Sequence, residues 1–322
     1  MDDRFLEVQD LKMYFPVRTS LFKSTPLKAV DGVSFTIPKG KTLGLVGESG
    51  CGKSTVGRTV LQLYKPTGGQ VLFKGKPPEA DMARFRKEAA MVFQDPYSSL
   101  DPRMSVLDLI AEPLDIHRLC KSSAERRDRV LELMEQVGLN RRLLSRFPHE
   151  FSGGQRQRIV IARALATNPK LLMCDEAVSA LDVSVRAQTL NLLETLQQDL
   201  KLTYMFISHD LSVIEHICDR VAIMYLGKIV EIGTKDEIFN NPKHPYTQAL
   251  LSAIPVVGDN GPKRERILLE GDIPSPVNPP SGCRFHTRCK YATERCKTQV
   301  PKLAEIGNSH NVACFLCHDC ID

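Results

Sequence analysis

A glycine-rich run that ends in lysine and serine is the first candidate for chemistry in this chain. Residues 47–54 read Gly-Glu-Ser-Gly-Cys-Gly-Lys-Ser and fit the pattern G-x-x-x-x-G-K-[ST]. In such a loop backbone N–H groups turn inward around phosphates, Lys53 neutralises the β- and γ-phosphate oxygens, and Ser54 binds Mg²⁺. A buried strand over 42–46 is expected before the loop, and a helix through Leu63 after it. This order favours a nucleotide site over a glycine-rich turn with an exposed lysine.

An acidic pair, Asp175 and Glu176, ends the apolar run 170–174. Parallel sheets bind ligands at the carboxyl ends of their strands, where this pair is expected to lie. Asp175 is expected to hold Mg²⁺, directly or through water, and Glu176 to polarise the attacking water. Such a pair can also be a helix N-cap with a favourable first-turn charge. The phosphate loop in the same chain favours the catalytic interpretation.

Two further polar residues follow expected strands. Gln94 lies where the run Met91 to Phe93 enters a loop rich in Pro, Ser and Asp, so its amide is a candidate for the metal or the attacking water. His209 follows a strand expected over 204–208 and is a candidate to hydrogen-bond a γ-phosphate oxygen. A turn role for the glutamine and a helix-capping role for the histidine are the alternatives, and only the other motifs make the catalytic roles specific.

The run Ser152, Gly153, Gly154 and Gln155 opens a helix that is expected to continue through Ala164. The serine hydroxyl, the glycine amides and the positive end of the helix dipole together predict an anion site.

The elements around these residues predict an α/β fold. Strands alternate with helices, which indicates a largely parallel sheet with covered faces. At 322 residues the chain has room for one large domain and one smaller domain. Residues 95–165 are expected to be mostly helical, and a helix over 122–139 is expected to start with a capping box of Ser122 and Glu125 and to stop at Gly138. The remaining expectations are strands over 5–8, 30–37, 70–73 and 171–174, a helix over 185–200 and a hairpin around 221–232.

The last part of the chain differs in composition. Nine of the 20 prolines lie between Pro242 and Pro301, so regular elements should be short there. The domain boundary is therefore expected near Asn241, which gives domains of residues 1–241 and 242–322.

Charge and hydropathy exclude several classes of protein. The net charge of +5 is spread along the chain, without the basic stripe of a nucleic-acid-binding protein. The acidic start is followed by no apolar stretch of the signal-peptide type, and no apolar run approaches the ~20 residues that cross a bilayer. A cytoplasmic location is expected.

Taken together, the motifs give a specific resemblance. The phosphate loop, Gln94, the 152–155 run, the acidic pair, the Ser-Ala-Leu-Asp loop at 179–182 and His209 occur in the order found in ATP-binding cassette (ABC) transporter subunits, which this chain resembles. The resemblance implies a P-loop, RecA-like core with an antiparallel β subdomain and a helical subdomain at about 95–165. It also implies a head-to-tail dimer, in which the 152–155 run contacts the γ-phosphate bound to the opposite subunit.

The resemblance also assigns roles to residues. Glu176 is expected to be the catalytic base, with His209 and Gln94 beside it, while Ser54, Gln94 and Asp175 bind Mg²⁺. The adenine is expected to stack on Phe15, which is favoured over Tyr14. The ATP-binding residues implied are Phe15, Gly47, Ser49, Gly50, Cys51, Gly52, Lys53, Ser54, Thr55, Gln94, Asp175, Ser152, Gly153, Gly154 and Gln155.

Finer matches point to one branch of the family. The segments 94–104, 244–250 and 274–282 resemble the ATP-binding subunits of dipeptide and oligopeptide importers, and the extended start resembles the second of the two ATPase subunits of these importers. The expected partners are a homologous ATPase, two permeases whose coupling helix docks beside 94–104, and indirectly an extracytoplasmic peptide-binding protein, with the chain peripheral to the cytoplasmic membrane face. Ala177 stands where this branch usually has proline, with little effect expected.

The sequence leaves two alternatives to peptide import. Nickel or another solute is the closest competitor, because the solute never touches this chain. A non-transport ABC ATPase is disfavoured, because the stretch between Ser54 and Ser152 is too short for the coiled coil of repair clamps and one cassette is present where translation factors usually carry two.

Six of the ten cysteines lie between Cys283 and Cys320. Four thiolates can hold zinc or an iron–sulfur cluster, and the spacing is wider than in a zinc ribbon. The resemblance favours a [4Fe–4S] cluster on Cys283, Cys289, Cys296 and Cys314, with a structural role as the default; Zn²⁺ and unligated thiols are the alternatives. Cys317 and Cys320 stay unassigned. The other four cysteines are expected to be reduced.

Overall fold

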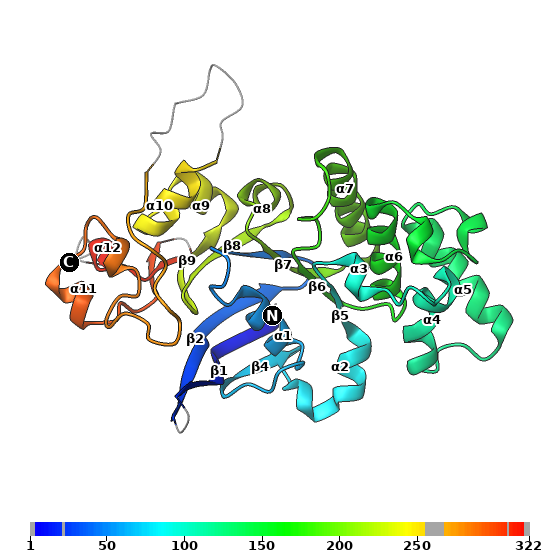
Figure 1. Cartoon of the computed structure of the whole chain (residues 1–322), viewed down its shortest axis with the longest axis horizontal. Coiled ribbons are helices and arrows are strands. Elements are labelled where there is room, and N and C mark those ends of the chain that lie inside the picture. The colour runs from blue at the N-terminus through cyan, green and yellow to red at the C-terminus, as the bar shows by residue number, and fades with distance from the viewer. Residues whose placement is uncertain (1–3, 21–22, 255–266, 308, 319–322) are drawn as a thin grey trace, which may run out of the picture. The chain divides into compact units, whose positions relative to one another are not determined.

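The structure is a computed structural model, and it describes residues 4–20, 23–254, 267–307 and 309–318 (Figure 1). The chain forms two compact units. The first comprises Met1–Leu6, Ile37–Thr42 and Leu72–Ile207, and the second comprises Glu7–Thr36, Leu43–Val71 and Ser208–Asp322.

Three parallel strands form the centre of the first unit. They are β5 (Ala89–Val92), β6 (Leu171–Asp175) and β7 (Thr203–Ser208), and β6 lies between the other two. Every residue of β6 and β7 is buried, as expected for strands covered on both faces. The register pairs Cys174 with Val92 on one side and with Phe206 on the other, so all three strands end at the same edge.

Between β5 and β6 the first unit is mostly helical, as expected for residues 95–165. Helices α4, α5 and α6 pack against one another and are drawn in green in Figure 1. The helices are α2 (Met82–Glu88), α3 (Pro96–Ser99), α4 (Val106–Ile116), α5 (Ser123–Gln136), α6 (Gly153–Leu165) and α7 (Val183–Leu200), with 3₁₀ turns at Pro78–Asp81, Arg141–Leu143 and Pro148–Glu150.

Helix α5 starts and stops almost where the sequence predicts, but its cap differs. The Ser122 hydroxyl accepts a hydrogen bond from the Glu125 backbone at 3.1 Å. The Glu125 carboxylate, however, accepts from the backbone N–H of Lys121 at 2.6 Å, so the reciprocal capping box is wrong. Gly138 follows the helix with φ of 69°, the left-handed conformation that glycine tolerates best.

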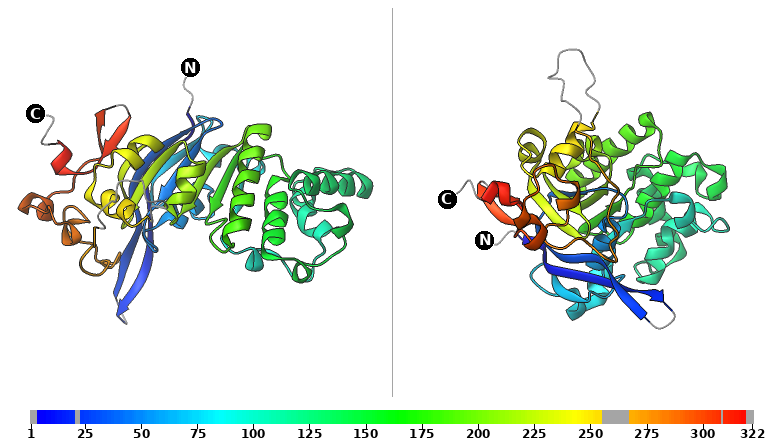
Figure 2. Two further views of the ribbon diagram at one scale, coloured as in Figure 1. Left: turned by 90° about the horizontal axis from the view of Figure 1, so that it is seen from above. Right: turned by 60° about the vertical axis from the view of Figure 1, so that its left-hand side comes forward.

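The second unit contains two sets of strands. Strands β1 (Arg4–Ser20), β2 (Lys23–Pro38) and β4 (Gly68–Phe73) form a sheet in the order β2-β1-β4, and the long β1–β2 ribbon is blue in Figure 2. The first two strands are much longer than expected. The other strands of this unit lie in the order β10-β11-β9-β8-β3. Their bounds are β3 (Thr42–Val46), β8 (Arg220–Tyr225), β9 (Lys228–Thr234), β10 (Ala304–Gly307) and β11 (His310–Val312).

Two predictions about these strands are confirmed. β3 has the bounds expected from the sequence, and β8 and β9 form the expected antiparallel hairpin. β11 pairs with β9, so residues near the C-terminus extend the sheet of the second unit.

The helices of the second unit are short. Helix α1 ends at Val60 rather than Leu63, because Gln62 adopts a left-handed conformation with φ of 58°. The short elements expected after Pro242 are also observed. The helices are α1 (Lys53–Val60), α8 (Leu211–Ile217), α9 (Lys235–Asn240), α10 (Pro245–Ser252), α11 (Glu294–Thr298) and α12 (Phe315–His318), with a 3₁₀ turn at His286–Arg288.

Candidate active site

The phosphate loop connects the buried strand β3 to helix α1, and close packing explains two of its glycines. A Cβ atom on Gly47 would lie 2.1 Å from the carbonyl oxygen of Met224. Gly52 has φ of 107°, and a Cβ atom there would lie 2.1 Å from the carbonyl oxygen of Ala29. Only glycine fits at these positions. Of the other residues named from the sequence, Ser49, Gly50 and Cys51 lie in the loop, and Ser54 and Thr55 lie in the first turn of α1.

Lys53 is the first residue of α1 and bends back over the loop. Its Nζ donates to the carbonyl oxygens of Gly47 at 2.7 Å and Glu48 at 3.0 Å. Only 5% of the lysine is exposed, and the two bonds hold its charge against the loop. Burial raises the pKa of the neighbouring Cys51 thiol, which therefore remains protonated. The loop thus offers one fixed cation and the N-terminus of an eight-residue helix to phosphates.

The acidic pair and Gln94 lie together in the first unit. Asp175 is the last residue of β6 and is 2% exposed. Gln94 Nε2 donates to Glu176 Oε2 at 2.8 Å, although 82 positions separate the two residues. This bond leaves the Gln94 carbonyl oxygen as the atom suited to a metal ion. The structure therefore brings Gln94 to the residue that directly follows Asp175.

The backbone of Glu176 is held in an unusual conformation. Its φ is 49°, in the left-handed region that non-glycine residues seldom adopt. Its N–H donates to Ile207 O at 2.9 Å, and its carbonyl oxygen accepts from the Ser179 hydroxyl at 2.9 Å. Strain of this kind persists only where surrounding contacts fix it, and it is frequent at catalytic positions. The two contacts fix the backbone of Glu176, and the bond from Gln94 positions its carboxylate.

Helix α6 opens as the sequence predicts. Ser152 is its N-cap, and a capping box joins Ser152 to Gln155 in both directions, at 3.3 Å and 3.1 Å. Gly153 and Gly154 form the first turn, and a Cβ atom on Gly154 would lie 2.4 Å from Val185 Cγ1 on α7. Arg156 stacks on Tyr97 at 4.0 Å. The serine is exposed, so the positive end of this helix is accessible to an anion.

His209 belongs to the second unit and follows β7 directly. It is exposed, and the cap of the following helix α8 is its neighbour Asp210, whose carboxylate accepts from Ser212 N at 3.0 Å. The alternative role of His209 as the helix cap is therefore wrong.

Comparison with known proteins bears on this arrangement. Residues 30–179 match the family model described as ABC transporter, and residues 230–296 match the model described as oligopeptide/dipeptide transporter, C-terminal region. The chain is 56% identical over 322 residues to the oligopeptide transport ATP-binding protein AppF of Bacillus subtilis, covering 98% of each chain. The chain belongs to the family of ABC transporter ATP-binding proteins.

Two further relatives agree with this assignment. The ABC ATPase is 52% identical to the dipeptide transport ATP-binding protein DppF of Haemophilus influenzae, covering 95% of this chain and 94% of the relative. It also resembles the dimeric ATP-binding cassette MJ0796 bound to ADP and Pi, with a TM-score of 0.62 and 27% identity over 71% of this chain and 98% of that chain. The mixed α/β ABC fold expected from the sequence is confirmed.

The two aromatic candidates for adenine differ in their contacts. Phe15 is half-buried and meets Tyr64 edge to face, with ring centroids 5.4 Å apart. Tyr14 donates its hydroxyl to the Asp31 carboxylate, and burial followed by this bond raises the pKa of Tyr14 to about 12. The ring of Phe15 carries no polar group, which is consistent with the preference for it as the stacking residue.

The four cysteines proposed as cluster ligands approach one another. Cys283 N donates to Cys296 O at 2.8 Å. Burial, and then the neighbouring thiols of Cys296, Cys314 and Cys289, raise the pKa of Cys283 to about 11. Among the residues that the structure describes, however, no group of three or more His, Cys, Asp or Glu side chains is arranged to hold a metal ion. A [4Fe–4S] or zinc site is therefore not shown, although the donor set is chemically suited to either.

Of the two cysteines left unassigned, Cys317 lies in the described part of the chain. The thiol of Cys317 lies 3.8 Å from the Lys243 carbonyl oxygen, and its bond to Cys314 raises the pKa of the latter. Cys320 lies outside the described residues. No disulfide joins the cysteines within the described ranges.

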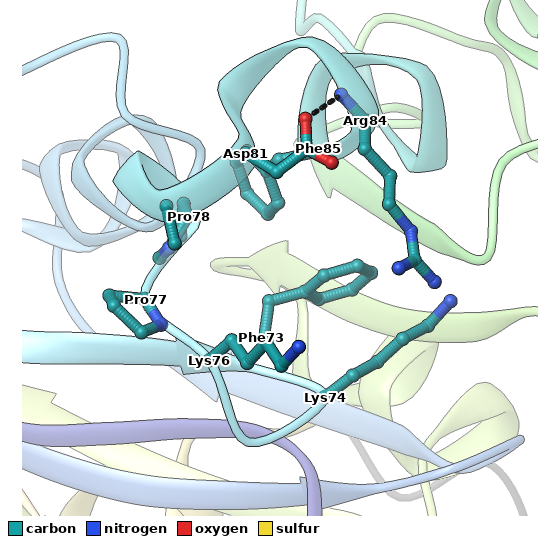
Figure 3. Close-up of a pocket in the computed structure, with 9 residues that line it drawn as sticks. Phe73, Lys74, Lys76, Pro77, Pro78, Asp81, Arg84 and Phe85 are labelled. Carbon is teal, nitrogen blue, oxygen red and sulfur yellow. Dashed lines mark hydrogen bonds between the residues drawn. The ribbon is translucent and has the colours of Figure 1, made fainter.

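A separate pocket in the first unit contains none of the candidate residues (Figure 3). Phe73 and Phe85 meet edge to face at 5.2 Å in its wall. Lys74 and Arg84 lie opposite Pro77 and Pro78 in Figure 3, and both cations bond to Glu88. Its volume of about 140 Å³ is well below the ~300 Å³ at which ligand pockets begin. The pocket is too small for a nucleotide.

For the stretches 4–20, 23–254, 267–307 and 309–318, no helix combines the length and the hydropathy needed to span a bilayer.

The sequence motifs do not predict the residues that contact the phosphate loop at Glu48. Arg288 and Tyr246, both far along the chain, contact Glu48 in the loop. The G-x-x-x-x-G-K-[ST] pattern allows any residue at position 48, so it carried no signal for these contacts.

Proposed function

We propose that this chain binds and hydrolyses ATP to power the import of dipeptides or oligopeptides across the cytoplasmic membrane. The observation that carries this proposal is the 56% identity to an oligopeptide transport ATP-binding protein over 98% of the chain. The match of residues 230–296 to the C-terminal region of oligopeptide/dipeptide transporters supports the peptide branch. Lys53, Glu176 and the 152–155 run are all present, which supports turnover rather than binding alone.

Each proposed catalytic residue has a separate role. Lys53 neutralises the β- and γ-phosphate oxygens, and Phe15 stacks on the adenine. Glu176 accepts a proton from the attacking water, and Gln94 orients the Glu176 carboxylate through the 2.8 Å bond. His209 donates a hydrogen bond to a γ-phosphate oxygen. Ser54, Gln94 and Asp175 offer oxygen atoms suited to Mg²⁺, which when bound draws negative charge from the phosphates.

The proposed assembly is a head-to-tail pair of homologous ATPase subunits beneath two permeases. The dimer of MJ0796, to which the chain is similar, supports this pairing. Ser152, Gly153, Gly154 and Gln155 then serve the ATP of the partner, and the segment 94–104 receives the permease. The chain would lie at the cytoplasmic face of the membrane, and the solute would reach the permeases through an extracytoplasmic peptide-binding protein. Nucleic acid has no proposed role.

Reconstitution tests the transported solute. The chain, its partner ATPase and both permeases in proteoliposomes are expected to accumulate a labelled dipeptide or oligopeptide only when ATP and the binding protein are present. Nickel uptake measured in parallel is the control for the closest alternative. ATP-dependent nickel uptake without peptide uptake would contradict the peptide assignment.

We also propose a small C-terminal domain over 242–322, after the nucleotide-binding domain of 1–241, held together by a metal centre on Cys283, Cys289, Cys296 and Cys314. A metal centre can replace a hydrophobic core that is too small to order a short segment. The cysteine spacing is wider than in a zinc ribbon, and the resemblance to dipeptide and oligopeptide importer subunits favours a [4Fe–4S] cluster over Zn²⁺.

Metal analysis tests the cluster. Protein purified without oxygen is expected to contain about four irons per chain and to absorb broadly near 400 nm. Cys289→Ser should lower the iron content, whereas Cys120→Ser, at a cysteine outside the group, should leave it unchanged. Stoichiometric zinc, or iron that is retained in Cys289→Ser, would contradict the proposal.

A further inference from the structure

The segment between the first two cysteines of the tail contacts the phosphate loop. Arg288 Nη1 donates to both carboxylate oxygens of Glu48, at 2.9 Å and 3.2 Å. The Arg288 side chain is 8% exposed and the Glu48 side chain 22% exposed, so water screens this ion pair less than a surface pair. Glu48 is the second residue of the loop. A residue 240 positions away therefore fixes one side of the loop.

Helix α10 adds a second contact at the same loop residue. The Tyr246 hydroxyl accepts a hydrogen bond from Glu48 N at 3.0 Å, and Tyr246 is fully buried. Burial raises the pKa of Tyr246, so the hydroxyl stays neutral. His244 caps α10 by accepting from Tyr246 N at 3.1 Å, and burial lowers the pKa of His244 to about 4, so the ring is neutral and can accept. The position of Tyr246 is thus set by its own helix.

An aromatic cluster supports both contacts. Phe285 is 1% exposed, and its ring lies 5.3 Å from Tyr225 and 5.4 Å from Tyr246. Aromatic pairs at these separations stabilise a fixed arrangement of rings. Phe285 and Arg288 belong to the same short segment, so the packing of Phe285 against the two tyrosine rings holds Arg288 in contact with Glu48 of the loop.

The same segment reaches the region proposed for adenine. Arg284 donates to the Leu226 carbonyl oxygen and to the Asp31 carboxylate, and Asp31 also accepts from the Tyr14 hydroxyl. Tyr14 precedes Phe15, the proposed stacking residue. One five-residue segment therefore connects to both ends of the proposed nucleotide site.

We propose that residues 284–288, here called the brace, position the phosphate loop for ATP, and that Arg288 is the positioning residue. This inference rests on the proposed role of residues 47–54 in binding phosphate. Gly50 and Gly52 have φ of 77° and 107°, so the loop contains two residues of high backbone freedom and needs external support. Arg288 supplies that support and also neutralises Glu48, whose carboxylate would otherwise repel the phosphates.

The neutralisation of Glu48 distinguishes a positioning role of Arg288 from a purely structural role. Arg288→Ala leaves an unpaired carboxylate in the loop, and Glu48→Gln removes that carboxylate. If Arg288 acts by fixing and neutralising Glu48, then adding Glu48→Gln to Arg288→Ala restores most of the ATP affinity. A purely structural role predicts that the double variant is no better than Arg288→Ala.

The test measures binding of a fluorescent ATP analogue, mant-ATP with Mg²⁺, to the purified full-length chain. Arg288→Ala is expected to weaken the affinity about tenfold, as a lost charge-assisted hydrogen bond predicts. Arg288→Lys should lie between this variant and the wild type, and it provides a second measurement if the alanine variant does not fold. The Arg288→Ala/Glu48→Gln variant should recover to within about threefold of the wild type.

Arg295→Ala is the matched control, because Arg295 lies in the same cysteine-rich part and stacks on Phe315 at 4.1 Å. Its affinity should equal that of the wild type. Three results would overturn the proposed role of the brace. They are an unchanged affinity in Arg288→Ala, an equal loss of affinity in Arg295→Ala, and no recovery of affinity in the double variant. Lys53→Ala tests the proposed loop itself: if it binds mant-ATP like the wild type, the phosphate-loop role fails, and if it loses binding while Arg288→Ala does not, only the brace fails.

Discussion

Glu176→Gln is expected to lower ATP turnover by the assembled transporter by about 10²- to 10⁴-fold, the range typical of a general base. The amide has nearly the same shape as the carboxylate, so the backbone at φ of 49° and its contacts to Ile207 and Ser179 should persist. It cannot accept a proton from water, however. ATP binding should be retained, because Lys53 is unchanged. Phosphate release and mant-ATP binding, measured on the same preparations, separate the two effects.

Glu132→Gln is the control for this prediction. Glu132 also belongs to the first unit, and its replacement by glutamine removes the same charge. Its side chain is exposed, however, and forms an ion pair with Arg129 at 2.9 Å on α5. Its turnover should match that of the wild type. Wild-type turnover in Glu176→Gln, or an equal loss in Glu132→Gln, would show that Glu176 is not the base.

Local patterns in the sequence predicted the parts of the site that depend on neighbouring residues. β3 has the expected bounds, because five apolar or small residues before a glycine loop can only form a buried strand in this context. Ser152 and Gln155 form a capping box at the start of α6, as their spacing of three residues predicts. The strand before Glu176 is longer than expected by one residue, since Asp175 still pairs with Ile207.

Contacts between distant residues were less predictable. The sequence places Gln94 and Glu176 in one set of motifs, but it does not predict the hydrogen bond between their side chains. Arg288 and Glu48 belonged to no motif, and an arginine in a proline-rich tail has many possible partners. The Glu125 carboxylate accepts a hydrogen bond from the backbone N–H of Lys121 and not from that of Ser122. The two donors are adjacent in the chain, and composition does not predict which of them is used. Side-chain partners of this kind depend on the folded geometry.

Gly153→Asp is expected to lower turnover by the assembled transporter on the order of a hundredfold, while the stability of the chain is unchanged or higher. Position 153 is the first residue of α6, where a carboxylate is favourable toward the helix dipole. A Cβ atom there would lie 4.0 Å from Leu181 Cδ2, an ordinary contact, so the side chain fits. The added carboxylate would occupy the proposed anion site and repel the γ-phosphate.

The decisive comparison is between the isolated chain and the assembled transporter. Ser123→Asp is the control, because Ser123 is the first residue of α5 and is exposed, so it receives the same charge at a helix end with no proposed phosphate. In the isolated chain Gly153→Asp should bind mant-ATP like the wild type, since this glycine serves the ATP of the partner. If the isolated variant loses ATP binding, the anion site acts on this chain's own nucleotide and the head-to-tail assignment is wrong. If its turnover in the transporter equals that of Ser123→Asp, the 152–155 run does not bind phosphate at all.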